Sequence, residues 1–406
     1  MSRHVSRYSD ETTDDVVLTE SFPGLRSLGL LDREQVPAAC VLNFLEFLPG
    51  LEQLTIGALL PMSRESFDLE KSTRCKKYHR LQGFHITHPT HTVTKELDET
   101  IAEFILPCTP FLTAITLRVL MPYTAAALAE QCKQLESLRV LDSAYSPSPT
   151  SSDVRANAPP HNFPALLLHG CPRLKNFFAT RHTIHVDKLL ERPIVCRGLE
   201  TFRCQIVGLE RLTPEEQTIF DTSKTATPQE EEGEEGKERA EQIQEKHQRS
   251  PDQHRQAYDT FASLTQLTTI DFGFEYIEPQ RINSVETPPL SLSSGAETCE
   301  ADGRVYVKGY GPTPNSLLLT LASGLDRLRS LRRLKEFGFR GVDHRVGEGE
   351  LKWMVEAWPR LERVTGVIDF TEIETFGIDC PKTRMLTAFL ELLRPGILLK
   401  NEHRRY

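Results

Sequence analysis

The chain lacks the sequence features of membrane-spanning, secreted and disulfide-linked proteins. No apolar run approaches the roughly 18 residues that a transmembrane helix needs, and FPALLLHG, from Phe163, is only a short core segment. The N-terminal stretch MSRHVSRYSDETTDD contains no apolar core of a signal peptide. The nine cysteines form no CxxC pair, which is typical of reduced thiols. We therefore expect a cytoplasmic or nuclear protein.

Net positive charge and catalytic signatures are also missing. The formal net charge of −9 disfavours a dedicated binder of nucleic acid or of anionic membranes. No GxSxG elbow, HExxH pair or glycine-rich phosphate loop occurs. Asp343, His344 and Arg345 are adjacent, but with no nucleophile in view they are interpreted as an ion-paired turn. We expect no enzyme activity, no cofactor, no nucleic-acid partner and no membrane partner.

One histidine-rich stretch is a candidate metal site. HITHPTH places His85, His88 and His91 at three-residue steps, with Cys75 and His79 upstream. A metal needs ligands that converge tetrahedrally, whereas here the first histidine lies in an expected strand and the others on a proline-containing turn. We expect polar loop residues and no metal.

What the chain does contain is one short phrase, repeated along its length. FPGLRSLGL, LPGLEQLTI, CKQLESLRV and WPRLERVTG share an apolar residue or Cys, then a Leu three residues on, then another apolar residue three residues later. Several steps, including the 26 residues from Leu25 to Leu51, match the roughly 20–29-residue period of leucine-rich repeats. The first Leu of the phrase occurs at Leu25, Leu51, Leu81, Leu112, Leu135, Leu174, Leu199, Leu267, Leu334 and Leu361.

The phrase predicts a strand, and the segments between phrases predict helices. Side chains alternate along a strand, so Leu54 and Ile56 face the core. AAALAEQCKQL, KELDETIAEFILPC and EGELKWMVEAWPRL carry helix formers at helical spacing, the last two ending near a proline. Units of this kind stack on one another. The predicted fold class is α/β: a leucine-rich-repeat, ribonuclease-inhibitor-like solenoid with a curved parallel sheet backed by helices.

Two further expectations concern packing. Cysteines stand at the helix-to-strand corners, where a small and often buried residue suits the turn: Cys108, Cys132, Cys171 and Cys196. Trp358 lies where the last expected helix meets the last phrase, so we expect it to pack against Leu361 and Val364 and to cap the end of the repeats.

The repeat rhythm is interrupted by polar segments. Residues 213–258 are rich in Glu, Gln and Lys, which is typical of disorder or of a solvated helix. We expect a disordered tail at 1–20, repeats at 21–212, an acidic low-complexity insert at 213–258, a repeat at 259–280, a flexible loop at 281–315 that ends in a short strand, and repeats at 316–406.

The strand positions that alternate with the core residues are candidates for partner contact. In a repeat protein they form an extended concave surface with a fixed backbone. The candidates are Gln53, Thr55, Ala114, Thr116, Ser137, Arg139, Thr201, Arg203, Gln205, Thr269, Asp271, Glu336 and Arg340.

The C-terminal segment resembles a known family. GFRGVDHRVG followed by ELKWMVEAWPRLE, within residues 316–367, resembles the end of fungal F-box and leucine-rich-repeat proteins of the Mortierella type. The resemblance implies the substrate-recognition arm of an F-box type ubiquitin ligase. Its F-box would bind a Skp-type adaptor, but no F-box is recognisable ahead of Phe22, so an adaptor is expected only if an F-box lies upstream. The alternatives are a GTPase-activating leucine-rich-repeat protein and a free repeat scaffold that binds protein partners.

Overall fold

The computed structural model describes residues 24–61, 80–86, 95–141, 163–209, 212, 214–225, 234–273, 298–301, 304–307, 315–339, 346–366 and 381–400. The chain divides into two compact units. Unit 1 comprises residues 1–184 and 193–204, and unit 2 comprises residues 185–192 and 205–406. The boundary therefore falls near the end of β6 (Asn176–His185) and within β7 (Thr201–Val207), not at the acidic insert.

Every repeated phrase forms a strand that starts two residues after its first Leu. This agreement confirms the strand predictions, because a local pattern of alternating apolar residues was enough to place each strand. The remaining strands are β1 (Ser27–Pro37), β2 (Gln53–Leu60), β3 (Gly83–Ile86), β4 (Ala114–Leu117), β5 (Ser137–Val140), β8 (Thr269–Asp271), β11 (Glu336–Gly338) and β12 (Arg363–Thr365).

In unit 1 the strands follow one another in chain order, from β1 to β7. Strands β1 to β6 pair in parallel, and the same phrase position faces its counterpart at each step, as Gln53 faces Gly83 and Gly83 faces Ala114. Each phrase is also held by a shared hydrogen bond: the amides of Glu136 and Ser137 both donate to the Thr113 carbonyl, at 2.8 and 2.9 Å. Consecutive repeats of unit 1 are therefore stacked in register.

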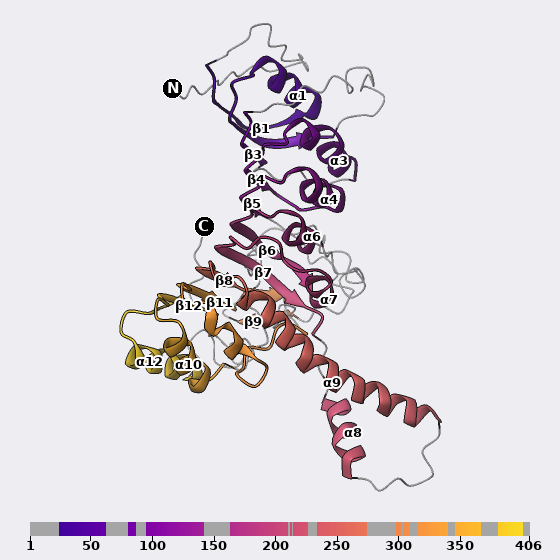
Figure 1. Ribbon diagram of the computed structural model, residues 1–406, viewed down its shortest axis with the longest axis vertical. Coiled ribbons are helices and arrows are strands. Elements are labelled where there is room, and N and C mark those ends of the chain that lie inside the picture. Colours follow the sequence, from indigo (N-terminus) through magenta and orange to yellow (C-terminus); the bar gives the residue numbers. More distant parts are fainter. Residues whose placement is uncertain are drawn as a thin grey trace. The chain divides into compact units, whose positions relative to one another are not determined.

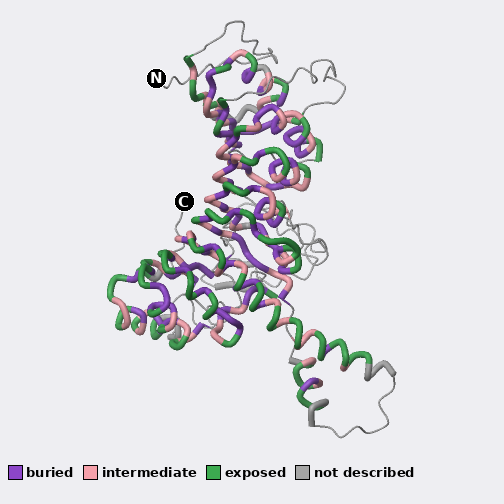
Figure 2. The backbone as a smooth tube through the Cα atoms, viewed as in Figure 1, coloured by how far each residue is buried: buried purple, intermediate pink, exposed green. Residues whose placement is uncertain are grey.

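Helices lie on one side of the unit 1 strands (Figure 1). Their apolar residues and the strand leucines are buried together (Figure 2), which is why each helix returns the chain to the same side. The helix predicted over 95–108 is confirmed, and the one predicted over 125–135 is present but begins and ends a few residues earlier, at 122–131. The helices are α1 (Ala38–Phe47), α3 (Lys95–Thr100), a π-helical turn (Ile101–Ile105), a 3-10 turn (Leu106–Cys108), α4 (Pro122–Gln131) and α6 (Phe163–Gly170).

The helix-to-strand corner has one hydrogen-bonding plan. The amide of the phrase Leu donates to the carbonyl three residues earlier, as from Leu135 to Cys132 at 3.0 Å and from Leu199 to Cys196 at 3.1 Å. The corner cysteines Cys108, Cys132, Cys171 and Cys196 are buried. The Cys171 thiol donates to the Leu128 carbonyl at 3.8 Å. Leu128 lies in α4, the helix of the repeat before. These cysteines thus fill the corners, as expected, and Cys171 also joins its own repeat to the one before it.

Unit 2 repeats the plan with strands in the order β8, β11, β12 and β13 (Leu398–Lys400), all paired in parallel. Its elements include a 3-10 helix (Leu325–Ser330), α10 (Glu348–Ala357) and α12 (Pro381–Leu393). The predicted helix over EGELKWMVEA is therefore confirmed. A separate antiparallel pair is formed by β9 (Thr298–Ala301) and β10 (Arg304–Val307). The short strand expected at RVYV is thus also present.

Trp358 is fully buried, at 0% exposure. Its ring lies 4.9 Å from that of Phe337 and 5.1 Å from that of Trp353, and its Nε1 donates to the Leu328 carbonyl at 3.0 Å. Its predicted place at the end of the repeats was wrong, because α12 and β13 follow. Arg394, just after α12, donates to the Trp358 carbonyl at 3.1 Å, so a further repeat contacts the turn at Trp358.

The acidic insert contains two helices, α8 (Pro214–Thr225) and α9 (Glu234–Ala262). Of the two interpretations of this segment, the described residues show the helix. Lys246 of α9 pairs with Glu216 of α8 at 3.0 Å, and the His247 ring lies 4.0 Å from that of Phe220. The end of α9 is a repeat helix, because Ala257, Tyr258 and Phe261 are fully buried. The repeat core therefore begins inside the predicted insert.

Candidate functional site

The predicted contact residues of unit 1 share one surface, the face of the strands opposite the helices. We call this surface the open strand face. Its residues alternate with buried ones along each strand, as in β4, where Ala114 and Thr116 are half-buried and Ile115 and Leu117 are buried. Arg139 is exposed, and the others are half-buried. Its predicted members are Gln53, Thr55, Ala114, Thr116, Ser137, Arg139, Thr201 and Arg203.

Parallel register arranges these side chains in rows that run across the strands. One row is formed by Thr55, His85, Thr116, Arg139 and Phe178, each facing the next on the neighbouring strand. Neighbouring strands are about 4.8 Å apart. A partner lying across the strands would therefore meet a new side chain at each such step.

His85 takes part in this row through two hydrogen bonds. Its Nδ1 lies 2.8 Å from Thr116 Oγ1, and its Nε2 lies 3.4 Å from Gln53 Oε1. Because the Gln53 oxygen can only accept, the proton is assigned to Nε2. Burial lowers the pKa of His85 from its usual 6.5, which favours this neutral form. Gly83 leaves room for the Gln53 side chain, because a Cβ there would overlap it.

The end of this row combines an aromatic ring with two cations. Phe178 on β6 lies in register with Arg139 on β5, and the Arg203 guanidinium lies 5.5 Å from the Phe178 ring centre. Phe178 and His85 were missed as contact residues in the sequence. Phe178 sits beside Phe177, which is buried, and only the strand alternation separates the two faces. That alternation was the available signal.

Two predicted contact residues do not belong to the open strand face. Gln205 continues the alternation of Thr201 and Arg203 but is only 1% exposed. Its prediction as an accessible contact was wrong. Near the end of β7 three consecutive residues, 204–206, are buried, so exposed and buried residues no longer alternate there. Arg340 lies outside the described residues.

The equivalent predicted residues of unit 2 are Thr269, Asp271 and Glu336, and all are half-buried. Asp271 Oδ1 accepts from the Gly273 amide at 2.9 Å, and Glu336 is ion-paired with Arg363 on the next strand. Gly338 lies between the Asp271 and Thr365 side chains, where a Cβ would overlap Asp271. The charges of Asp271 and Glu336 are thus used within the unit itself.

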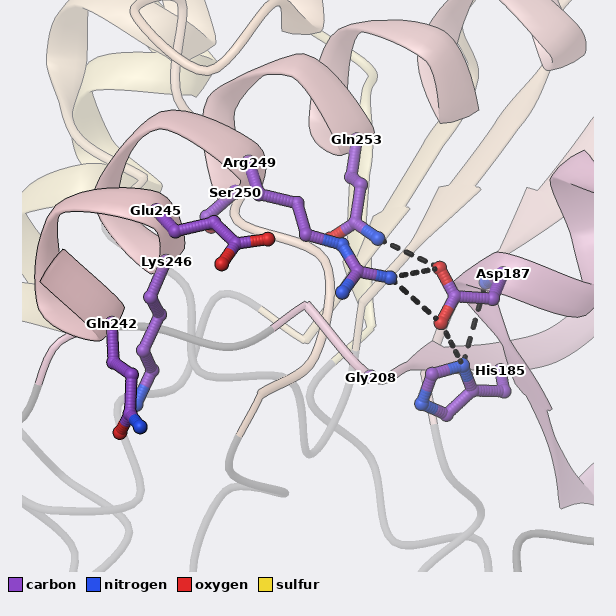
Figure 3. A pocket seen from close by; sticks show the side chains of 9 residues that line it. All are labelled: His185, Asp187, Gly208, Gln242, Glu245, Lys246, Arg249, Ser250 and Gln253. Carbon is purple, nitrogen blue, oxygen red and sulfur yellow. Dashed lines mark hydrogen bonds and ion pairs between the residues drawn. The ribbon is translucent and has the colours of Figure 1, made fainter. Parts of the chain in front are cut away.

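Unit 2 also contains a polar pocket of about 190 Å³ between α7 (Val186–Leu190), the chain after β7, and α9 (Figure 3). Its centre is Asp187. The Arg249 guanidinium donates to both Asp187 oxygens, at 3.0 and 3.2 Å, and Gln253 Nε2 donates to one of them at 2.8 Å. The arrangement joins α9 to α7. Lining residues are His185, Asp187, Gly208, Gln242, Glu245, Lys246, Arg249, Ser250 and Gln253.

This pocket does not have the geometry of a Ser–His–Asp hydrolase. In a triad the histidine nitrogen remote from the acid contacts the serine hydroxyl. Here His185 Nδ1 lies 3.5 Å from the Asp187 carboxylate and accepts from the Asp187 amide. The opposite nitrogen, Nε2, faces Gly208, where an added Cβ would overlap the ring. Asp187 is therefore a structural anchor.

Within the described residues, no group of three or more His, Cys, Asp or Glu side chains could hold a metal ion. Of the histidine-rich stretch only His85 is described, and the other four candidate ligands lie outside the described ranges, as do Asp343, His344 and Arg345. No helix in the described part of the chain is long and apolar enough to span a bilayer.

No protein-family model matches the chain, and no curated protein matches it. Among solved structures it is similar to a leucine-rich-repeat protein of Leptospira interrogans. The identity is 12%, the TM-score is 0.23, and the match covers 92% of this chain and 94% of that chain.

Proposed function

We propose that this chain is a leucine-rich-repeat solenoid that binds a protein partner on its open strand face. The observation that carries the proposal is the row from Thr55 to Phe178, in which polar and aromatic side chains stand in register on parallel strands. Because the shared hydrogen bonds fix the backbone, little conformational entropy would be lost when these side chains contact a partner. The role is one of binding, not catalysis.

The repeat assignment is supported by the recurrence of one unit. Ten phrases give ten strands, and the corner turn and the shared carbonyl recur from unit to unit. A local phrase whose strand pairs with the next phrase is how repeat proteins build a continuous sheet. We place the protein in the cytoplasm or the nucleus, on the basis of its scattered reduced thiols.

Site-specific photocrosslinking tests the binding face. The full chain would carry a photoreactive phenylalanine analogue either at Thr116, on the open strand face, or at Glu130, an exposed residue of α4 on the helix side. We expect a partner to cross-link from position 116 and not from position 130. Cross-linking only from position 130 would place the interface on the helices and contradict the proposal.

We further propose that the partner is a substrate of an F-box type ubiquitin ligase. This proposal rests on the resemblance of residues 316–367 to F-box and leucine-rich-repeat proteins. Its test is co-purification of a Skp-type adaptor with the product of the complete gene. If the gene encodes no F-box upstream and no adaptor co-purifies, the ligase role fails while the binding role of the open strand face stands.

A further inference from the structure

We infer that the open strand face recognises an acidic peptide segment that carries an aromatic or aliphatic side chain, through Arg139, Phe178 and Arg203. This inference rests on the proposed binding function and adds the chemistry of the partner. The three residues lie on the consecutive strands β5, β6 and β7, with the ring between the two cations. We call them the Arg–Phe–Arg cluster.

Arg139 is the exposed member of the cluster. Within the described residues its guanidinium makes no hydrogen bond or ion pair, although it alternates along β5 with the buried Leu138 and Val140. Arginine donates in a planar fork that matches a carboxylate. No described residue pairs with its charge, and a carboxylate that approaches from solvent can do so.

Among the described residues, the acidic residue nearest to Arg139 in sequence does not cancel this charge. Glu136, just before β5, is paired with Lys175 at 2.8 Å and with Arg173 at 3.6 Å. The hydrogen bond from Lys175 lowers the pKa of Glu136, as expected for a carboxylate held by cations. Glu136 together with its two partners has a net positive charge, so this edge of the face also attracts an anion.

Phe178 gives the cluster an apolar contact surface. The ring is half-buried, and the Arg203 guanidinium at 5.5 Å is positioned for a cation–π interaction. A ring held in this way presents a rigid surface to an apolar side chain at a low entropic cost. Aromatic residues and arginine are also the residues that most often dominate binding energy at interfaces.

The spacing fits an extended peptide. Arg139 and Arg203 are two strand steps apart, or about 10 Å. Side chains on the same face of an extended peptide are about 7 Å apart, a separation that two long arginine side chains can span. A nucleic acid is less favoured, because neutralising a run of phosphates takes many cations, whereas the cluster contains two arginines.

Selection from a random-dodecapeptide phage library on the immobilised full chain tests the inference. We expect enrichment of Asp or Glu close to Phe, Tyr, Trp or Leu. A selected peptide, labelled with fluorescein, would then be titrated by fluorescence anisotropy. Arg139→Ser should weaken binding about tenfold, whereas the matched control Arg80→Ser, at another exposed arginine of unit 1, should change it less than twofold. Binding to the wild-type chain should also weaken with salt.

Charge reversal separates a specific effect from a loss of folding. Arg139→Glu should favour Lys- or Arg-rich peptides in a new selection, while its circular dichroism stays as in the wild type. Peptides without acidic enrichment that still cross-link to position 116 would overturn the inference and leave the proposed function intact. Selection of no peptide would also overturn it. Arg139-dependent binding of fluorescein-labelled oligouridine, tighter than that of any peptide, would overturn it in favour of a nucleic acid.

Discussion

Replacement of Trp358 by alanine is expected to unfold the end of unit 2 before the rest of the chain. The side chain is 0% exposed and contacts the rings of Phe337 and Trp353. Truncation of a fully buried tryptophan costs about 3–5 kcal/mol. The lost hydrogen bond to the Leu328 carbonyl contributes only about 1 kcal/mol of this, because that carbonyl also accepts from the Leu331 amide at 3.0 Å.

Two companion variants divide that cost into its parts. Trp358→Phe keeps most of the apolar volume and removes the hydrogen bond to Leu328, so it should cost about 1–2 kcal/mol. Trp353→Ala removes the half-buried neighbour and should cost less than Trp358→Ala, because a part-exposed ring loses less burial.

Urea unfolding followed by circular dichroism measures these costs. Because the chain has two tryptophans, Trp353 remains as a fluorescent reporter of unit 2 in the Trp358→Ala variant. Hydrogen exchange should show the amides of 325–339 and 346–366 opening before those of β2 to β5, since stacked repeats are coupled mainly to their neighbours. A cost below about 1 kcal/mol, or equal loss of protection in unit 1, would refute the packing argument.

Four further outcomes are expected. Gly208→Ala should lower the free energy of unfolding by about 2 kcal/mol or more, because φ is 84° and a Cβ would overlap His185. Gly198→Ala, at a position in open space, is the control. Equal urea midpoints for the two variants would contradict the predicted strain at Gly208. Asp187→Asn should speed hydrogen exchange in α9 around its contacts at 249–253; unchanged exchange would mean that the anchor is dispensable. Burial raises the pKa of three corner cysteines from 9.0 to about 12, so they should resist iodoacetamide at pH 8, and their contribution to stability should be lost as pH rises above 9. Because the pKa of His85 is lowered, the wild type should lose stability as pH falls below 6.5 and His85→Gln should lose less; identical pH profiles would argue against a buried neutral ring.

The strands and the helix-to-strand corners could be predicted from sequence because both depend on short-range patterns. A Leu followed three residues later by an apolar residue places one side of a strand in the core, and all ten strands begin where this pattern predicts. Cys132 and Cys171 could be assigned to corners because small residues with a burial preference fit the turn before a strand. Repeats were predicted to residue 406, but the strand of the last repeat was missed because Ile397 takes the place of the phrase Leu. The Ile397 amide donates to the Arg394 carbonyl as that of Leu361 does to the Trp358 carbonyl.

Composition misled where a helix has one polar and one buried face. The Glu- and Gln-rich segment that ends at Tyr258 has few apolar residues, and nothing local shows that Ala257 and Tyr258 enter a core. That core is supplied by residues distant in sequence, as when the Tyr258 hydroxyl donates to the Leu318 carbonyl at 2.8 Å. Residue order alone contains no record of such a contact.

The sequence by itself determined which residues face the core of each unit, because that choice depends on alternation within a few residues. Tertiary structure decided which outward side chains become neighbours. Arg139, Phe178 and Arg203 are separated by loops and helices of unequal length, and only the pairing of β5, β6 and β7 brings them together. It also decided that Gln205 is buried. Register between strands is a long-range property, so the candidate binding surface could be predicted residue by residue but not as a cluster.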